Sequence, residues 1–261
     1  MPGESAPVPA TFLAVMKYQK RSYRNAILGT RLTHFQVKVK ETDLMVSAPI
    51  PLESAARELI LTHRGYLEAY IDQYPDFQKT LTPWRISGPA PAIVREMALA
   101  GQKAGVGPMA AVAGAISEAV GSGLLQVSDE IIIENGGDTF FKTRLPVIVG
   151  IYAGNSPLSL KIGLKVDSTV HPVSLCTSSG TVGHSLSFGK ADAVCVMSDS
   201  CALADAVATA VGNRVQSAGD ISSAIHFGKN IPGVSGLAVI IGKDMGLWGS
   251  LEVIPLRGKK C

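Results

Sequence analysis

The sequence of 261 residues predicts an α+β fold with a largely antiparallel sheet. The first observation is the alternation of apolar and polar residues in HFQVKVKETDLMVSA, residues 34–48, which is typical of a hairpin with one solvent-facing side. The second is that the later apolar runs follow one another through short turns, as antiparallel strands do. The third is that helical and strand patterns do not alternate regularly, as they would in a parallel sheet.

Three helices are expected before the strand-rich half. Residues 52–70 carry apolar side chains at helical spacing, and Pro75 closes that segment. A second helix is predicted over residues 92–103. The third, PMAAVAGAISEAVGSGLL, begins at Pro108 and is so rich in small residues that another element must pack close to it.

The second half predicts six strands and one amphipathic helix. The helix is CALADAVATAVGNRV, residues 201–215. The strands are EIIIEN (130–135), LPVIVGIYA (145–153), SLKIGLKV (159–166), ADAVCVMS (191–198), GLAVIIG (236–242) and GSLEVIPL (249–256).

Composition and charge narrow the classes of function. Apolar residues make up 46 % of the chain and charged residues 17 %, as in a globular protein. Aromatic residues are 6 % and the net charge is +3, which disfavours a nucleic-acid partner. No run of about 18 apolar residues is present, and MPGESAPVPA at the N-terminus lacks the pattern of a signal peptide. We expect a flexible tail at residues 1–10, one domain over residues 11–261, a cytoplasmic location and no membrane partner.

One cysteine pattern and one glycine pattern resemble known sites but lack the context that those sites require. Cys176, Cys195, Cys201 and Cys261 lack the spacing of zinc ligands, so buried thiols are expected. The segment GVGPMA at residues 105–110 superficially fits a dinucleotide-binding pattern, but a helix and not a strand precedes it.

The polar run CTSSGTVGHS, residues 176–185, is the first candidate site. A phosphatase-like cysteine nucleophile is not expected at Cys176, because Val182 stands where an arginine would bind phosphate. Thr177, Ser178 and Ser179 present hydroxyls and amides either as a nest for phosphate or as a turn that satisfies its own backbone.

His184 lies within the same run, between two small residues and outside any apolar stripe. The alternatives are a general acid or base, a donor to phosphate, and a buried core histidine.

A second candidate is ENGGD, residues 134–138. Gly136 and Gly137 fit either a tight turn or a place where backbone approaches a ligand, with Asn135 and Asp138 beside them.

A third candidate is the pair Asp205 and Thr209, four residues apart among small apolar residues of a helix. This spacing places the carboxylate and the hydroxyl on one face, and a buried aspartate needs a partner. Mg²⁺ would provide one; the alternative is a helix N-terminal cap.

Short motifs resemble, in order along the chain, the ApbE superfamily of flavin transferases: residues 106–108, the turn 136–138, residues 177–180, and Ala204-Asp205 with Thr209. The sequence is most similar to a cytoplasmic, poorly characterised ApbE-like family of archaea and anaerobic bacteria, on KETDL (40–44), VGPMAAVAGAI (106–116), ENGGD, CTSSGTVGHS and FGKAD, and the similarity covers about residues 17–255. The resemblance implies a duplicated T-fold-type two-layer arrangement. It also implies Mg²⁺ at Asp205 and Thr209, and a cleft for FAD or FMN lined by residues 135–138 and 177–179.

The resemblance further implies transfer of FMN from FAD to a threonine hydroxyl of another protein. The transferases carry a lysine where this chain has Ser117 or Glu118, and their Asp-Pro-x-Thr-Gly after the histidine is absent. The alternatives are therefore a non-transferring accessory or ligand-binding protein, as the closer family implies for sulfide assimilation and homocysteine synthesis, and a hydrolase of another phosphorylated small molecule that uses His184.

Overall fold

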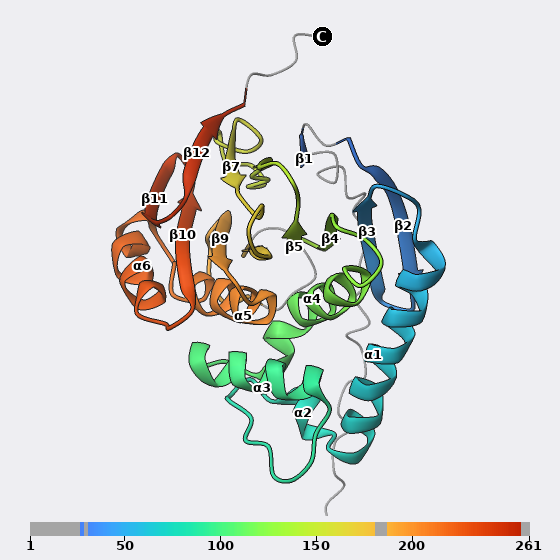
Figure 1. Ribbon diagram of the computed structural model, residues 1–261. Helices are drawn as coiled ribbons and strands as arrows, with labels where there is room; N and C mark the ends of the chain where they lie inside the picture. The colour runs from blue at the N-terminus through green and yellow to red at the C-terminus, as the bar shows by residue number, and fades with distance from the viewer. Residues whose placement is uncertain (1–26, 29–30, 181–186, 257–261) are drawn as a thin grey trace, which may run out of the picture.

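Two antiparallel sheets and a layer of helices make up the computed structural model, which describes residues 27–28, 31–180 and 187–256 (Figure 1). The strands are β1 (Ile27–Leu28), β2 (Thr33–Val39), β3 (Thr42–Ala48), β4 (Ile131–Asn135), β5 (Asp138–Lys142), β6 (Val147–Gly150), β7 (Ile162–Val166), β8 (Val173–Ser178), β9 (Ala193–Ser198), β10 (Val234–Ile241), β11 (Asp244–Gly249) and β12 (Glu252–Pro255). The helices are α1 (Glu53–Gln73), α2 (Asp76–Lys79), α3 (Ala92–Ala104), α4 (Val112–Leu124), α5 (Cys201–Gly212) and α6 (Ile221–Lys229), with 3₁₀ turns η2 (Pro108–Ala111) and η3 (Ala218–Asp220).

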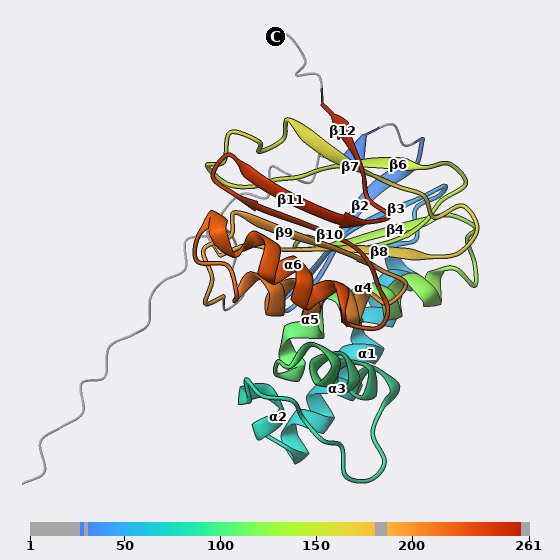
Figure 2. The same cartoon turned by 90° about the vertical axis from the view of Figure 1, so that its left-hand side faces the viewer.

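The larger sheet has eight strands in the order β11-β10-β9-β8-β5-β4-β3-β2, and the smaller has four in the order β1-β6-β7-β12. Within the described ranges, the paired neighbours run antiparallel. Figure 2 shows the small sheet on one face of the large sheet, and α4, α5 and α6 on the other. The predicted α+β class with an antiparallel sheet is confirmed.

The predicted hairpin and the three predicted helices are also present. Strands β2 and β3 pair in one register from Thr33 with Ala48 to Val39 with Thr42. Helix α3 ends at Gly105, whose left-handed φ of 74° stops the helix. The helix expected from Pro108 starts as η2 and continues as α4.

The sequence patterns do not predict β5, β8, β11 or α6. Strand β8 is the clearest difference from expectation. The sequence suggests either a phosphate nest or a hydroxyl-rich turn at Thr177 and Ser178, but both residues belong to the end of a sheet strand. The backbone of β8 pairs with β5 on one side and β9 on the other. Two ladders of hydrogen bonds outweigh the local turn preference of serine and threonine.

Helix α5 is not amphipathic, although an amphipathic helix is predicted over residues 201–215. Each of its residues except Asp205 is buried. The helix packs against β8 and β9 of the large sheet and against α3 and α4. An all-round apolar helix is typical of a core position, so Asp205 is a polar exception within a buried element.

The two hydrophobic clusters lie on opposite faces of the large sheet, and β9 contributes to both. Val194 and Val196 belong to the cluster under the helices, whereas Ala193, Cys195 and Met197 belong to the cluster shared with the small sheet. A central strand buried on both faces explains why ADAVCVMS is a nearly continuous apolar run.

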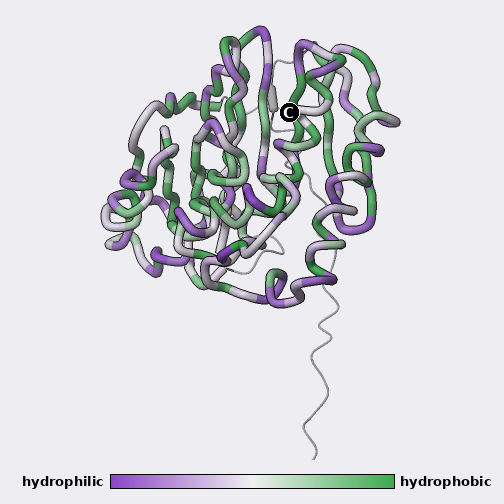
Figure 3. Tube along the Cα trace, turned by 60° about the horizontal axis from the view of Figure 1, so that its bottom comes forward, coloured by the Kyte–Doolittle hydropathy of each residue, from purple (hydrophilic) through white to green (hydrophobic). Residues whose placement is uncertain are grey.

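Hydrophobic and hydrophilic residues interleave along the described chain (Figure 3). None of the described helices is by itself long and apolar enough to cross a membrane. Helix α3 and the segment Pro108–Leu124 reach that threshold jointly, but they are bent by 105° relative to each other.

Candidate functional site

The β4–β5 turn, the end of β8, the start of α4 and the middle of α5 come together on the helix side of the large sheet. The turn is tight: Asn135 pairs with Asp138, and Gly136 and Gly137 have φ values of 71° and 114°. The Gly136 N–H donates to Glu134 Oε1 at 2.7 Å. The tight-turn interpretation of ENGGD is thus confirmed, and glycine is required there because both φ values are positive.

Side-chain hydrogen bonds hold this turn against α4 and β8. Asn135 Nδ2 donates to Ala113 O at 3.1 Å, and Ser117 Oγ donates to Asp138 O at 3.1 Å. The Thr177 N–H donates to Gly137 O at 3.2 Å. The predicted residues of ENGGD and of CTSSG are therefore brought side by side by sheet pairing.

Asp205 is fixed by the backbone of α4. Its Oδ2 accepts a hydrogen bond from the Gly114 N–H at 2.9 Å. A Cβ added to Gly114 would lie 2.2 Å from Cys201 O, so only glycine permits this approach of α4 to α5. This close contact confirms that another element packs tightly on the small-residue helix.

Asp205 and Asp138 are close enough to interact as like charges, and both are poorly solvated. Burial raises the pKa of Asp205 to about 7, against hydrogen bonds from the amides of Gly114 and Ala113. Burial, followed by the charge of Asp205, also raises the pKa of Asp138 well above its ordinary value. The opposing interactions at Asp138 come from the Cys176 thiol and the Thr177 amide rather than from lysine or arginine. Such a pair gains stability by holding a proton or a cation.

Thr209 lies one helical turn after Asp205 and is 9 % exposed. The cap alternative for Asp205 is wrong, because Ser200 is the N-cap of α5 and its side chain accepts from the Leu203 N–H. Asp205 is thus an interior helix residue, and its place in an otherwise buried helix requires another explanation.

The remaining predicted hydroxyl groups line the end of β8. Thr177 Oγ1 donates to Cys195 Sγ at 3.5 Å, and Ser178 and Ser179 follow at the strand end. His184 lies outside the described residues, so its role stays a prediction.

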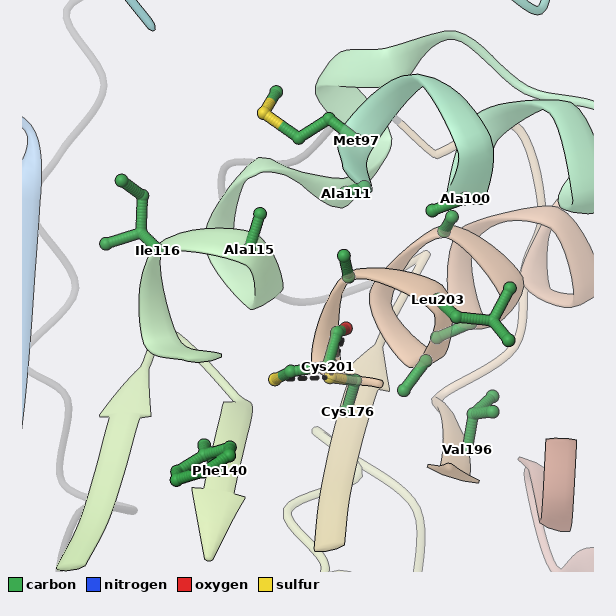
Figure 4. Close-up of a cluster of buried hydrophobic side chains, with 14 of the residues drawn as sticks. Met97, Ala100, Ala111, Ala115, Ile116, Phe140, Cys176, Val196, Cys201 and Leu203 are labelled. Carbon is green, nitrogen blue, oxygen red and sulfur yellow. Dashed lines mark hydrogen bonds between the residues drawn. The ribbon is translucent and has the colours of Figure 1, made fainter. Parts of the chain in front are cut away.

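The cysteines of this region are buried, as expected. Cys176 Sγ lies 3.5 Å from Cys201 Sγ and points toward it from β8 (Figure 4). Burial raises the pKa of the Cys176 thiol well above its ordinary value, which opposes formation of the thiolate. A nucleophilic role for Cys176 is therefore not supported.

The donor set fits a hard cation better than a zinc ion. Among the described residues, no group of three or more histidine, cysteine, aspartate or glutamate side chains is placed to hold a metal. Mg²⁺ is commonly held by one or two carboxylates together with phosphate oxygens of a substrate. Asp205, Thr209 and the neighbouring Asp138 match that donor set.

Glu118 is a site-region residue whose role the sequence did not indicate. Its Oε2 accepts from the Cys201 N–H at 2.8 Å and more weakly from the Ala202 N–H and Ser200 Oγ, both at 3.4 Å. A carboxylate at the start of α5 stabilises the helix N-terminus. Its sequence neighbours in α4 carry no signal for this contact, because Glu118 and Cys201 meet only in the folded chain.

A shallow hollow of about 550 Å³ lies elsewhere, between α6 and β11. Its lining includes none of the predicted site residues. The candidate site is instead defined by Asp138, Asp205 and their hydrogen bonds, because carboxylates can bind a cation or a proton and the hollow contains neither of these two.

Comparison with known proteins agrees with this fold. A family model described as AbpE bacteria matches residues 24–240. A UPF0280 protein of Methanocella arvoryzae is 44 % identical, over 83 % of this chain and 89 % of that relative. A UPF0280 protein of Methanococcus aeolicus is 41 % identical, over 84 % of this chain and 91 % of that relative.

Solved structures show the same fold at low identity. The apo flavinyl transferase ApbE of Pseudomonas stutzeri aligns with a TM-score of 0.56 and 14 % identity, covering 84 % of this chain and 94 % of that chain. The flavin transferase ApbE of Vibrio cholerae aligns with a TM-score of 0.53 and 11 % identity, covering 84 % of this chain and 97 % of that chain. The family match and the archaeal relatives together show that this chain belongs to the AbpE bacteria family, alongside the UPF0280 proteins.

Proposed function

We propose that this protein binds a flavin nucleotide together with Mg²⁺, at Asp205 and Thr209 and along residues 135–138 and 177–179. The observation that carries the proposal is the pair of neighbouring carboxylates, buried Asp138 and half-buried Asp205, which repel each other beside the hydroxyl-bearing end of β8. A divalent cation would relieve this repulsion, and a diphosphate would complete its oxygen ligands. The flavin transferases of the same fold make FAD the first nucleotide to test.

The first enzymatic hypothesis is transfer of FMN from FAD to a hydroxyl of an acceptor protein. The acceptor oxygen forms a bond to the FMN phosphorus, the P–O bond to AMP breaks, and AMP leaves. Bound Mg²⁺ would stabilise the negative charge that develops on the leaving phosphate. Asp205 and Thr209 hold the cation side of the site, and His184 is our predicted acceptor of the hydroxyl proton.

A second candidate is flavin binding without transfer, as an accessory protein. Glu118 favours it, because the resemblance places a lysine of the transferases at or next to this position, whereas Glu118 here caps α5. Loss of a cation near a diphosphate weakens its binding and the stabilisation of a leaving phosphate.

The test is a titration with FAD, with and without Mg²⁺, that follows flavin fluorescence and then AMP release. We expect Mg²⁺ to tighten binding in the wild type and Asp205→Asn to remove that Mg²⁺ effect. The asparagine keeps an acceptor for the Gly114 amide, so the fold should be retained. Asp199→Asn is the matched control, because Asp199 is an exposed acid just before α5.

The outcomes separate the candidates. AMP release that depends on Asp205 supports transfer or diphosphate cleavage, whereas Mg²⁺-dependent binding without AMP supports the accessory role. A Mg²⁺ effect of equal size in Asp205→Asn would contradict the metal assignment.

A further inference from the structure

Three glycines bring the segment 187–191 into backbone contact with Gly180 and Gly212, which follow the site residues of β8 and α5 in the sequence. A Cβ added to Gly180, just after β8, would lie 2.1 Å from Gly189 O. A Cβ added to Gly189 would lie 1.8 Å from Gly212 O, at the end of α5. The Gly180 N–H also donates to Ala191 O at 2.9 Å. Residues 187–191 are therefore wedged between the end of β8 and the last turn of α5, which begins at Thr209.

Phe188 lies on this segment, and hydrogen bonds hold both its N–H and its carbonyl group. Its N–H donates to Asn213 Oδ1 at 2.8 Å, and its carbonyl accepts from Gln216 Nε2 at 2.8 Å. The residue is nevertheless 59 % exposed. An exposed aromatic ring on a fixed backbone is suited to stacking, because little conformational entropy remains to be lost on contact.

Lys190 follows on the same segment. Its N–H donates to Val215 O at 2.7 Å, and its Cα would lie 3.2 Å from a Cβ on Gly180. Lys190 is exposed and forms no ion pair with the residues that the structure describes. It therefore offers a cation next to the strand end that carries Thr177 and Ser178.

We propose that Phe188 and Lys190 form the rim of the flavin site, with Phe188 stacked on the isoalloxazine ring and Lys190 paired with a phosphate. This inference rests on the proposed function and narrows the ligand to a molecule with a flat ring and a phosphate. Two residues span at most about 7 Å of chain, and the flexible lysine stem extends that reach toward the phosphate. Lys190 would supply a cation from the C-terminal end of α5, whereas Glu118 lies at its N-terminal end.

The experiment compares the wild type with Phe188→Ala, Phe188→Tyr and Lys190→Gln, in the presence of Mg²⁺. Riboflavin, FMN and FAD are titrated separately while flavin fluorescence is followed. Lys161→Gln is the matched control, because Lys161 is an exposed lysine next to β7 of the small sheet. Thermal melting of each variant verifies that it is folded.

Phe188→Ala should weaken all three ligands by about tenfold and reduce fluorescence quenching, whereas Phe188→Tyr should retain both. Lys190→Gln should weaken FMN and FAD by about tenfold and leave riboflavin unchanged, because riboflavin has no phosphate.

The possible failures are distinguishable. If the wild type binds none of the three flavins, both the proposed function and this inference are overturned. If the wild type binds FAD and the folded variants bind it equally well, this inference alone is overturned. Equal weakening of riboflavin and FMN by Lys190→Gln would overturn the assignment of Lys190 to phosphate.

Discussion

Asp138 and Asp205 illustrate at the residue scale how a fold creates a reactive setting from ordinary side chains. Each carboxylate loses solvation in the folded chain, and the charge of Asp205 further raises the pKa of Asp138. Amide hydrogen bonds from Gly114 and Ala113 offset part of that cost at Asp205. The site is thus kept in a strained electrostatic state that a proton relieves at low pH and a cation relieves at high pH.

Asp205 should make the free energy of unfolding fall as pH rises from about 4 to about 7. Its ordinary pKa of 3.8 is raised to about 7 in the folded chain, so between these values the folded state holds a proton that the unfolded state has lost. The free energy of unfolding therefore decreases from about pH 4 to about pH 7, by a few kcal/mol. Urea denaturation of the wild type and Asp205→Asn at pH 5 and pH 8 measures this.

The asparagine variant should lose less stability between the two pH values than the wild type. Mg²⁺ should stabilise the wild type more at pH 8 than at pH 5, because the carboxylate must be ionised to bind it. Parallel pH profiles for the two proteins would contradict the assignment.

At the scale of elements, the position of Asp205 depends on how closely α4 approaches α5. Gly114 permits the contact, and Glu118 on the next turn of α4 accepts from the first amides of α5. The same helix α4 also holds the β4–β5 turn through Ser117. The site geometry is therefore set mainly by one helix pair.

Gly114→Ala should separate these helices. Its Cβ would lie 2.2 Å from the Cys201 carbonyl oxygen, which is backbone and cannot rotate away. We expect a loss of about 1–3 kcal/mol in the free energy of unfolding and a loss of the Mg²⁺ effect on FAD binding. Urea denaturation and the flavin titration measure the two effects.

Gly65→Ala is the matched control in α1, because a Cβ there meets nothing within 4 Å. That substitution should be neutral or stabilising by up to about 1 kcal/mol. Equal stability of Gly114→Ala and the wild type would show that the helix contact is more tolerant than its geometry indicates.

At the scale of the whole molecule, the large sheet joins the two hydrophobic clusters. Strand β9 contributes alternate residues to each cluster. Disruption of the packing in one cluster would therefore expose one face of β9 and weaken the packing of the other cluster. The helix layer with the site and the small sheet therefore share one structural support. The single domain over residues 11–261 stays our prediction.

The chain should accordingly unfold in one cooperative step. Scanning calorimetry should give one transition with equal calorimetric and van't Hoff enthalpies. Two resolved transitions would instead indicate parts that unfold independently. A stable fragment after limited proteolysis between β11 and β12 would indicate the same.

Local patterns in the sequence determined much of this protein. The two-residue period of residues 34–48 specifies the β2–β3 hairpin, and apolar spacing of about 3.6 residues specifies α1 and α3. The glycine pair of ENGGD specifies its turn, since positive φ angles favour glycine. The ordered motifs also identified the family.

The tertiary structure alone decided what those patterns could not. Pairing with β5 and β9 made Thr177 and Ser178 part of a strand, against their turn preference. Packing on all sides turned an apparently amphipathic helix into the buried α5, with Asp205 as its polar exception. The nearness of Asp205 to Asp138, and of Glu118 to the start of α5, depends on contacts between segments distant in the chain. Periodicity describes one segment at a time, whereas electrostatic coupling and desolvation arise only when segments share a low-dielectric interior.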